Sequence, residues 1–448
     1  MHDVTDLREM LADEIVERRE SGHLVAQPDP RVLLAADDDE LRAAIMAVEA
    51  SALSPSWPYE EPDGLAAISA ARAATPRVVA RALGDGALLD RLHGAWLGRC
   101  AGCALGKPVE NWPRAELRRY LQSLDAYPLT DYVPADGPAP PGFPALDESW
   151  PVSVRGAIRG MPRDDDLDYT ILGLHILETY GSQFSAADVA REWLRRFPFL
   201  AVHTAERAAY RNLVLGLTPP ATATHLNPYR EWIGALIRVD AYAYAAAGDP
   251  ERAATLAFQD ASLSHTANGV YGAMWAAALI AASFAERTMT AALDTALGVV
   301  PPRSRLAEAL RGVAALRARG SSWESARDAL EERHGALSPV HAINNATVVA
   351  AALLWGEGDF TSTIGLAVQG GWDTDCNGAT AGSAFGAMHG AEALPSHWTT
   401  PLEDRIASAL LGSDGVRISD LATRSFAVAK AIRLGELSRP RTRGRQAV

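Results

Sequence analysis

The chain has 448 residues, and its 42 Lys and Arg against 55 Asp and Glu give a formal net charge of −13. A chain of this length can bury a large core in one or two domains. Because binding to phosphates needs a concentrated basic face, this acidic balance argues against nucleic acid as a partner.

The sequence offers no segment suited to a membrane. Residues 1–20 mix acidic and basic side chains at helical spacing, unlike a secretory signal. The mostly apolar stretch 269–285 is too short and too rich in Ala, Ser and Gly for a membrane span, so we expect a buried helix there. The three cysteines exclude a disulfide framework and fit a reducing compartment. We expect a cytoplasmic protein, a monomer or a homodimer, without a membrane partner.

Taken in chain order, the elements are predicted to be almost entirely helical. Apolar residues recur at three- and four-residue spacing in Ala-rich segments, and strand-like alternation is nearly absent, so the predicted fold class is all-α. We expect an N-terminal helical extension over residues 1–87, a compact multi-helix domain over 88–438 and a disordered basic tail over 439–448. Helices are predicted at residues 186–197, 253–261, 305–317 and 346–355.

Proline and glycine mark two further features. The many prolines between 128 and 151 prevent a long helix and predict a loop that could form the rim of a site; residues 218–228 have the same character. Glycines recur every fourth residue from Gly94 to Gly106 and again from Gly378 to Gly386. Because glycine costs about 1 kcal/mol in a helix interior, this repetition predicts two helices that approach each other closely.

The first acidic cluster is Asp164, Asp165 and Asp166, at the start of an apolar-periodic helix. One aspartate suffices for a helix cap, and adjacent carboxylates that repel one another are commonly held together by a divalent cation. A solvated acidic helix start is the alternative. We expect Asp168, two residues later, to be solvated rather than a substitute ligand.

A second cluster, Asp373 and Asp375, follows Gly370 and Gly371 in a turn between two predicted helices. Asp-x-Asp in such a turn can aim two carboxylates at one point, which suits oxygen ligation of a hard cation. A simple turn without a ligand is the alternative.

Two other segments carry polar groups at helix junctions. Glu110 follows Pro108 at the end of the first glycine-repeat helix and can face a cavity, although most glutamates in such positions are solvated. His265 lies between two predicted helices, where a hydrogen-bonded structural histidine is the commoner case. Cys100 and Cys103, in the glycine-repeat segment before Glu110, form a CxxC. The sequence has no second CxxC or CxxH that would complete a four-ligand zinc site, so we expect a packed, reduced pair.

In order and approximate spacing, these segments resemble the ADP-ribosylglycohydrolase family, to which the dinitrogenase reductase-activating glycohydrolases belong. The family's G-D-A-x-G-x-P-x-E segment, T-D-D-T helix start, S-H junction and G-G-D-T-D-T turn correspond to residues 102–110, 164–167, 264–268 and 370–376. The resemblance covers about residues 88–395. It implies an all-α fold with a central dinuclear metal site.

By position, the resemblance implies two Mg²⁺ ions, with Asp375 bridging them. The implied metal ligands are Asp164, Asp165, Asp166, Asp373, Asp375 and Cys376. Glu110, Asp165 and Asp375 take the catalytic positions. The implied substrate contacts are Glu110, His265, Asn268, Gly371 and Trp372, and Trp112, Trp150 or Trp372 could stack on a nucleobase.

This sequence departs from the family pattern at three positions. Asp164 replaces a ligating threonine, and as an aspartate it can still ligate. Cys376 replaces a second threonine, and a neutral thiol is a poor Mg²⁺ ligand. Cys103 replaces the aspartate of the G-D pair. The second ion could accordingly be weakly bound, replaced by Mn²⁺ or absent.

The resemblance implies hydrolysis of an N-glycosidic bond at C1 of ribose, in an ADP-ribosylated group or another small ribosylated molecule. A carboxylate such as Glu110 would accept the proton of the attacking water. The alternatives are an N-riboside hydrolase of a biosynthetic pathway, a non-catalytic ADP-ribose-binding scaffold and a two-metal phosphohydrolase.

Overall fold

The computed structural model describes residues 6–26, 36–72 and 83–436. Helices account for the regular structure throughout these ranges, and the only ladder contacts there are isolated bridges such as His23 with Leu53. The all-α prediction is therefore confirmed. The predicted tail at 439–448 lies outside the described residues.

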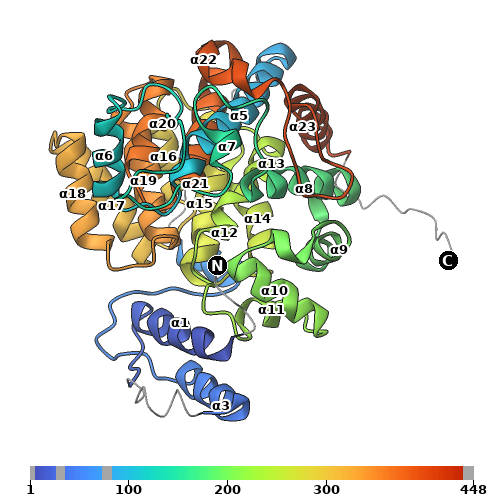
Figure 1. The fold of residues 1–448 in the computed structure, drawn as a ribbon. Helices are drawn as coiled ribbons and strands as arrows, with labels where there is room; N and C mark the ends of the chain where they lie inside the picture. Colours follow the sequence, from blue (N-terminus) through green and yellow to red (C-terminus); the bar gives the residue numbers. More distant parts are fainter. Residues whose placement is uncertain (1–5, 27–35, 73–82, 437–448) are drawn as a thin grey trace.

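The N-terminal part contains α1 (Leu7–Glu20), α3 (Asp38–Glu49) and α4 (Leu65–Ala71). Helices α1 and α3 have ordinary capping signals, since Asp6 and Asp37 accept hydrogen bonds from their first-turn amides. The two helices share a small apolar cluster that also contains Leu226 of the body. Figure 1 shows α1 and α3 side by side below the main body.

The body is a single large group of packed helices, shown in the upper part of Figure 1. Its helices of six or more residues are α5 (Asp85–Gly106), α6 (Arg114–Ser123), α8 (Asp165–Tyr180), α9 (Ala186–Arg196), α10 (Thr204–Val214), α13 (Asp240–Ala245), α14 (Pro250–Ala261), α15 (Ala267–Ser283), α16 (Met289–Leu297), α17 (Arg305–Ala318), α18 (Trp323–His334), α19 (Ala342–Trp355), α20 (Phe360–Gln369), α21 (Thr374–His389) and α23 (Ile418–Arg433). Shorter helices include α7 (Trp150–Ser153), α11 (Ala221–Thr224), α12 (Gly234–Ile237) and α22 (Ser396–Thr399).

Helices α5 and α21 form the most extensive helix pair of the body. A Cβ atom added at Gly98 or Gly102 would overlap the backbone of Gly382 or Gly378, and the reverse additions clash in the same way. The prediction from the two glycine repeats is therefore confirmed. Because the backbones touch directly, we call this contact the glycine seam, and it fixes the ends of both helices relative to each other.

The predicted buried helix is α15, whose residues are almost all inaccessible to solvent. It packs against α14, α12, α16 and α21, so it lies within the core. No helix in residues 6–26, 36–72 and 83–436 has the length and apolar content needed to cross a membrane.

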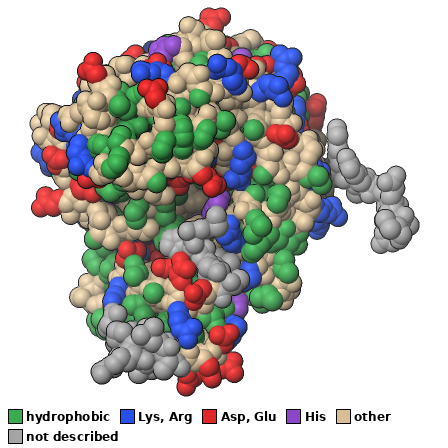
Figure 2. Space-filling view, viewed as in Figure 1, with side chains coloured by type: hydrophobic (Ala, Val, Ile, Leu, Met, Phe, Trp, Pro, Cys, Tyr) green, Lys and Arg blue, Asp and Glu red, His purple; other side chains and the backbone are tan. Residues whose placement is uncertain are grey.

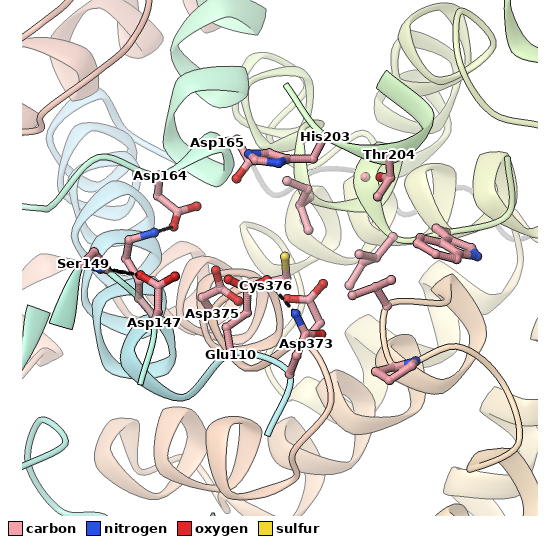
Figure 3. Close-up of a pocket in the computed structure, with 18 of the residues that line it drawn as sticks. Glu110, Asp147, Ser149, Asp164, Asp165, His203, Thr204, Asp373, Asp375 and Cys376 are labelled. Atoms are coloured by element: carbon pink, nitrogen blue, oxygen red, sulfur yellow. Dashed lines mark hydrogen bonds and ion pairs between the residues drawn. The ribbon is translucent and has the colours of Figure 1, made fainter. Parts of the chain in front are cut away.

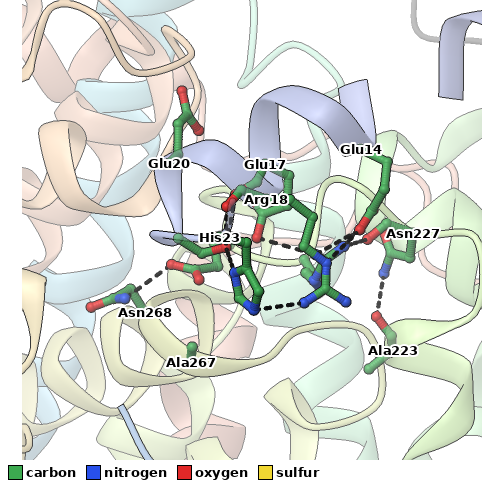
Figure 4. Close-up of polar contacts among 12 residues, drawn as sticks. Glu14, Glu17, Arg18, Glu20, His23, Ala223, Asn227, Ala267 and Asn268 are labelled. Carbon is green, nitrogen blue, oxygen red and sulfur yellow. Dashed lines mark hydrogen bonds and ion pairs between the residues drawn. The ribbon is translucent and has the colours of Figure 1, made fainter. Parts of the chain in front are cut away.

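A buried ionic network attaches α1 to the body (Figure 4). Arg230 contacts Glu14 at 2.7 Å and Glu17 at 3.6 Å. Arg305 pairs with Glu61 at 2.8 Å and with Glu231 at 2.7 Å. Charged groups removed from water need such partners, so these pairs specify how α1 and the following segment lie on the body.

Candidate metal and active site

The two acidic segments predicted from the sequence meet beside one end of the glycine seam. Asp164 is the N-cap residue of α8 and accepts a hydrogen bond from the Asp166 amide at 2.9 Å. Asp373 is the N-cap residue of α21, with Asp375 in the first turn of that helix. Figure 3 shows Asp164 and Asp165 on one side of a pocket and Asp373, Asp375 and Glu110 on the other.

The pocket is a cavity of about 690 Å³. The space-filling view shows a hollow near the middle of this face of the molecule, with acidic side chains at its edge (Figure 2). Its polar lining residues are Lys107, Glu110, Asn111, Asp147, Glu148, Ser149, Arg163, Asp164, Asp165, His203, Thr204, Glu206, Ser338, Asp373, Asp375 and Cys376. Residues 147–149 belong to the proline-rich loop, so the prediction that this loop forms part of a rim is confirmed.

Two groups of side chains beside the cavity have the spacing of a metal site, and a third, Glu17, Glu20 and His341, lies elsewhere in the described part of the chain. One consists of Cys103, Asp164, Asp166 and Asp375, and the other of Asp373, Asp375 and Cys376; in each group the ligand atoms lie within 4.8 Å of one another. Asp375 belongs to both groups.

The second group fits a divalent cation especially well. Asp373 Oδ1 and Asp375 Oδ1 are both buried and have no hydrogen-bond partner. A buried carboxylate oxygen without a donor is costly, and a hard cation is a natural partner for it.

The electrostatics of the site also favour a bound cation. Repulsion from Asp375, together with burial, raises the pKa of Glu110 well above its usual range. Burial and then Asp375 raise the pKa of Asp373 in the same way. Burial and the charge of Asp164 raise the pKa of Asp375 to about 7. Carboxylates in this state gain stability from a bound cation, which would favour their charged forms.

Two positively charged side chains already lie among the acids of α8. Lys107 Nζ is 2.6 Å from Asp164 Oδ2, and Arg99 contacts Asp166 at 2.9 Å and Asp240 at 3.0 Å. Burial alone would raise the pKa of Asp164, but Lys107 outweighs it and the pKa is lowered. Sequence reasoning missed both partners, although Lys107 stands within the same segment as Glu110.

Asp168 corrects an expectation, because it is buried rather than solvated. Its carboxylate accepts hydrogen bonds from Arg163 at 2.9 Å, from the Ser408 hydroxyl at 2.6 Å and from the Ala409 amide at 3.1 Å. Burial raises its pKa to about 6. The chain after α22 supplies two of these partners, and no local pattern in the sequence indicates that contact.

The family-like junction 264–268 lies away from the cavity lining. His265 is buried; its Nε2 accepts a hydrogen bond from the Ala235 amide at 3.3 Å, and its Nδ1 pairs with Ser264 at 2.8 Å. Asn268 bonds Glu61 and Glu231 at 2.9 Å each. These bonds connect helices and the N-terminal segment, and neither His265 nor Asn268 lines the cavity.

Gly371 and Trp372 shape the turn before Asp373 instead of lining the cavity. Both have positive φ, 74° for Gly371 and 64° for Trp372. The Arg327 guanidinium lies 3.8 Å from the centre of the Trp372 ring, which closes that aromatic face. Trp112 and Trp150 are not part of the lining either, whereas Trp232, which the sequence did not single out, is.

The three cysteines are all buried and unpaired. The prediction that Cys100 and Cys103 form no disulfide is confirmed, and burial raises the pKa of the Cys103 thiol well above its usual range. The Cys376 thiol donates to Asp166 Oδ2 at 3.2 Å. Burial also raises its pKa, so it enters the site as a neutral thiol.

The described part of the chain is thus an all-α body in which buried carboxylates able to hold a metal lie beside a polar cavity. The family model for ADP-ribosylglycohydrolase matches residues 85–433, and the chain belongs to that family. A solved structure titled "ADP-ribosylglycohydrolase-related protein complex" is 20% identical, with a TM-score of 0.50; the match covers 77% of this chain and 99% of that one. At this identity the likeness concerns the fold alone. No curated protein matches the sequence.

Proposed function

We propose that the protein hydrolyses N-glycosidic bonds to ribose and depends on a divalent cation, Mg²⁺ or Mn²⁺. Family membership supports a glycohydrolase-type function. The observation that carries the proposal is the pair of buried, unpartnered oxygens of Asp373 and Asp375 beside the cavity. A cation bound there would orient the ribose hydroxyls and polarise a water molecule.

Glu110 is the group placed to act as base. It lines the cavity with Asp375, and a cation bound beside Asp375 would favour the charged carboxylate of Glu110, which is the form that accepts a proton. Its carboxylate would accept the proton of the water that attacks C1 of ribose. As the bond to nitrogen breaks, positive charge develops on the sugar ring, and the surrounding acids stabilise that charge.

The charge of the cavity favours one kind of substrate. Eight Asp and Glu residues line it, whereas its Lys and Arg residues are Lys107 and Arg163. Lys107 is paired with Asp164 and Arg163 with Asp168. We therefore propose, as a second candidate in addition to an ADP-ribosylated group, a small N-riboside whose base carries a positive charge while it is bonded to ribose and leaves as a neutral molecule.

The test offers the full chain two N-glycosides, ADP-ribosyl-arginine and nicotinamide riboside, and for comparison the O-glycoside ADP-ribosyl-serine, each with Mg²⁺, with Mn²⁺ and with EDTA. Cation-dependent release of ADP-ribose or ribose, measured by chromatography, is expected for the wild type. Asp373→Ala and Asp375→Ala should abolish it, whereas Asp328→Asn, which removes an exposed acid paired with Arg114, should not.

Release of inorganic phosphate would contradict the proposal and favour phosphoryl transfer. Bound cation without hydrolysis of any compound would favour a ligand-binding role instead.

A further inference from the structure

The ammonium group of Lys107 lies inside the acidic site. Lys107 begins the short 3₁₀ turn that follows α5, and its side chain is 11% exposed. Its Nζ is 2.6 Å from Asp164 Oδ2. The acidic and thiol groups that act on it most strongly are Asp164, Asp375 and Cys103.

These three residues belong to the first of the two potential metal groups, whose fourth member is Asp166. Two members of this group, Asp164 and Asp166, lie at the start of α8, and their carboxylate oxygens already accept hydrogen bonds from protein donors. Asp164 accepts from Lys107 and from the Asp166 amide. Asp166 accepts from Arg99 through Oδ1 and from the Cys376 thiol through Oδ2. The first group thus has a cation of its own, supplied by the chain.

The second group has the opposite character. Asp373 and Asp375 are 3% and 4% exposed, and each has a buried Oδ1 without a hydrogen-bond partner. No lysine or arginine forms an ion pair with either carboxylate in the described part of the chain. Two unsatisfied carboxylate oxygens in one turn are what a divalent ion can bind.

We infer that the site binds one divalent cation, between Asp373 and Asp375, and that the Lys107 ammonium takes the place of a second ion at Asp164. The inference rests on the proposed metal dependence and replaces the expectation of two Mg²⁺ ions. The Lys107 ammonium carries a single positive charge and has no open coordination positions, so it balances charge at Asp164 but cannot bind substrate oxygens as a metal does.

The number of bound ions can be counted without any turnover. Full-length, EDTA-treated protein is titrated with Mn²⁺ while free Mn²⁺ is followed by electron paramagnetic resonance. One ion per chain, with the spectrum of an isolated Mn²⁺ at low temperature, is the expected result. Two ions per chain with a spin-coupled spectrum, or no bound ion, would overturn the inference.

Mn²⁺ binding by substituted proteins distinguishes the roles of the two groups. Asp375→Asn should weaken Mn²⁺ binding by more than about 100-fold, whereas Asp164→Asn should leave one bound ion and change its affinity less than about 10-fold. Asp168→Asn, which removes an acid from the same turn of α8, is the matched charge control. A loss of Mn²⁺ binding in Asp164→Asn as large as that in Asp375→Asn would contradict the assignment.

Lys107→Met removes the resident cation and should allow a second Mn²⁺ to bind at higher concentration. If this variant does not fold, the wild-type count and the Asp164 variant still decide the matter. A count of two would leave the hydrolase proposal standing. One bound ion without glycosidase activity would instead overturn the function and leave this inference intact.

Discussion

Asn345, near the start of α19, holds the turn that carries Asp373. Its Oδ1 accepts hydrogen bonds from the Asp373 amide at 3.1 Å and from Asn377 Nδ2 at 2.8 Å, while its own amide group donates to the carbonyls of Pro339 and His341. The residue therefore connects the loop before α19 to the first turn of α21. It positions a carboxylate of the site without lining the cavity.

Asn345→Ala should lower Mn²⁺ affinity by roughly 10- to 100-fold, because groups that orient a ligand matter almost as much as the ligand itself. Calorimetric titration of the metal-free protein measures the change. Asn344→Ala is the control, since the side chain of Asn344 bonds Ser338 and Asn345 and not the turn of Asp373. Equal losses in both variants would mean that α19 as a whole, rather than Asn345, sets the affinity.

For single residues, the aspartates of the site could be predicted from the sequence because each cluster lies at a local signal, either a helix cap or a turn. Lys107 and Trp232 carry no such signal, and their roles depend on which segments meet in the fold. The motif-like His265 shows the converse, because its position in the chain matches the family while its hydrogen bonds are those of a structural residue.

Among the elements, α5 and α21 set the geometry of the site. Gly98→Ala should destabilise the protein by several kcal/mol, because its Cβ would collide with the carbonyl of Gly382 and neither backbone can move aside. Urea unfolding followed by circular dichroism measures the loss. Gly86→Ala lies in the same helix with open space around it, so it should be neutral or stabilising by up to about 1 kcal/mol. Similar effects at both positions would contradict a specific role for the seam.

Long elements with a clear period could be predicted from the sequence. The segment expected at 186–197 is α9, Ala186–Arg196, and that expected at 305–317 is α17, Arg305–Ala318. Short helices such as α7 and α12 could not, because a single turn has too few residues to show periodicity and is stabilised by its surroundings.

For the molecule as a whole, the attachment of α1 introduces a dependence on pH. Burial raises the pKa of Glu17 to about 8 and that of Glu20 to about 7, against 4.5 for an ordinary glutamate. Their folded forms hold protons that the unfolded chain releases. The stability they contribute is therefore complete below about pH 4.5 and is lost as the pH rises through 7 and 8.

The free energy of unfolding should accordingly fall between pH 5 and 8, by up to about 1.4 kcal/mol per pH unit for each group. Glu17→Gln should make this slope shallower. Glu40→Gln, in the exposed first turn of α3, is a control that should leave it unchanged. Chemical denaturation at several pH values measures both, and identical slopes in wild type and Glu17→Gln would rule out Glu17 as the cause.

The division of the chain at residues 87 and 88 stays a prediction, but the way α1 lies on the body could not be foreseen. Its acids look like a solvated face in the sequence. In the structure, Glu14 and Glu17 are buried against Arg230, which comes from a distant segment. Partners so far apart in the chain leave no pattern in a single sequence.

The glycine seam also bears on how the chain acquires its activity during synthesis. The ribosome completes α5 long before α21, so the small-residue face of α5 stays uncovered while the segments between them are made. Asp373 and Asp375 reach Glu110 only when that face is covered. A chain terminated before α21 would accordingly lack half of the site and its central helix pair, and no partly active precursor is expected.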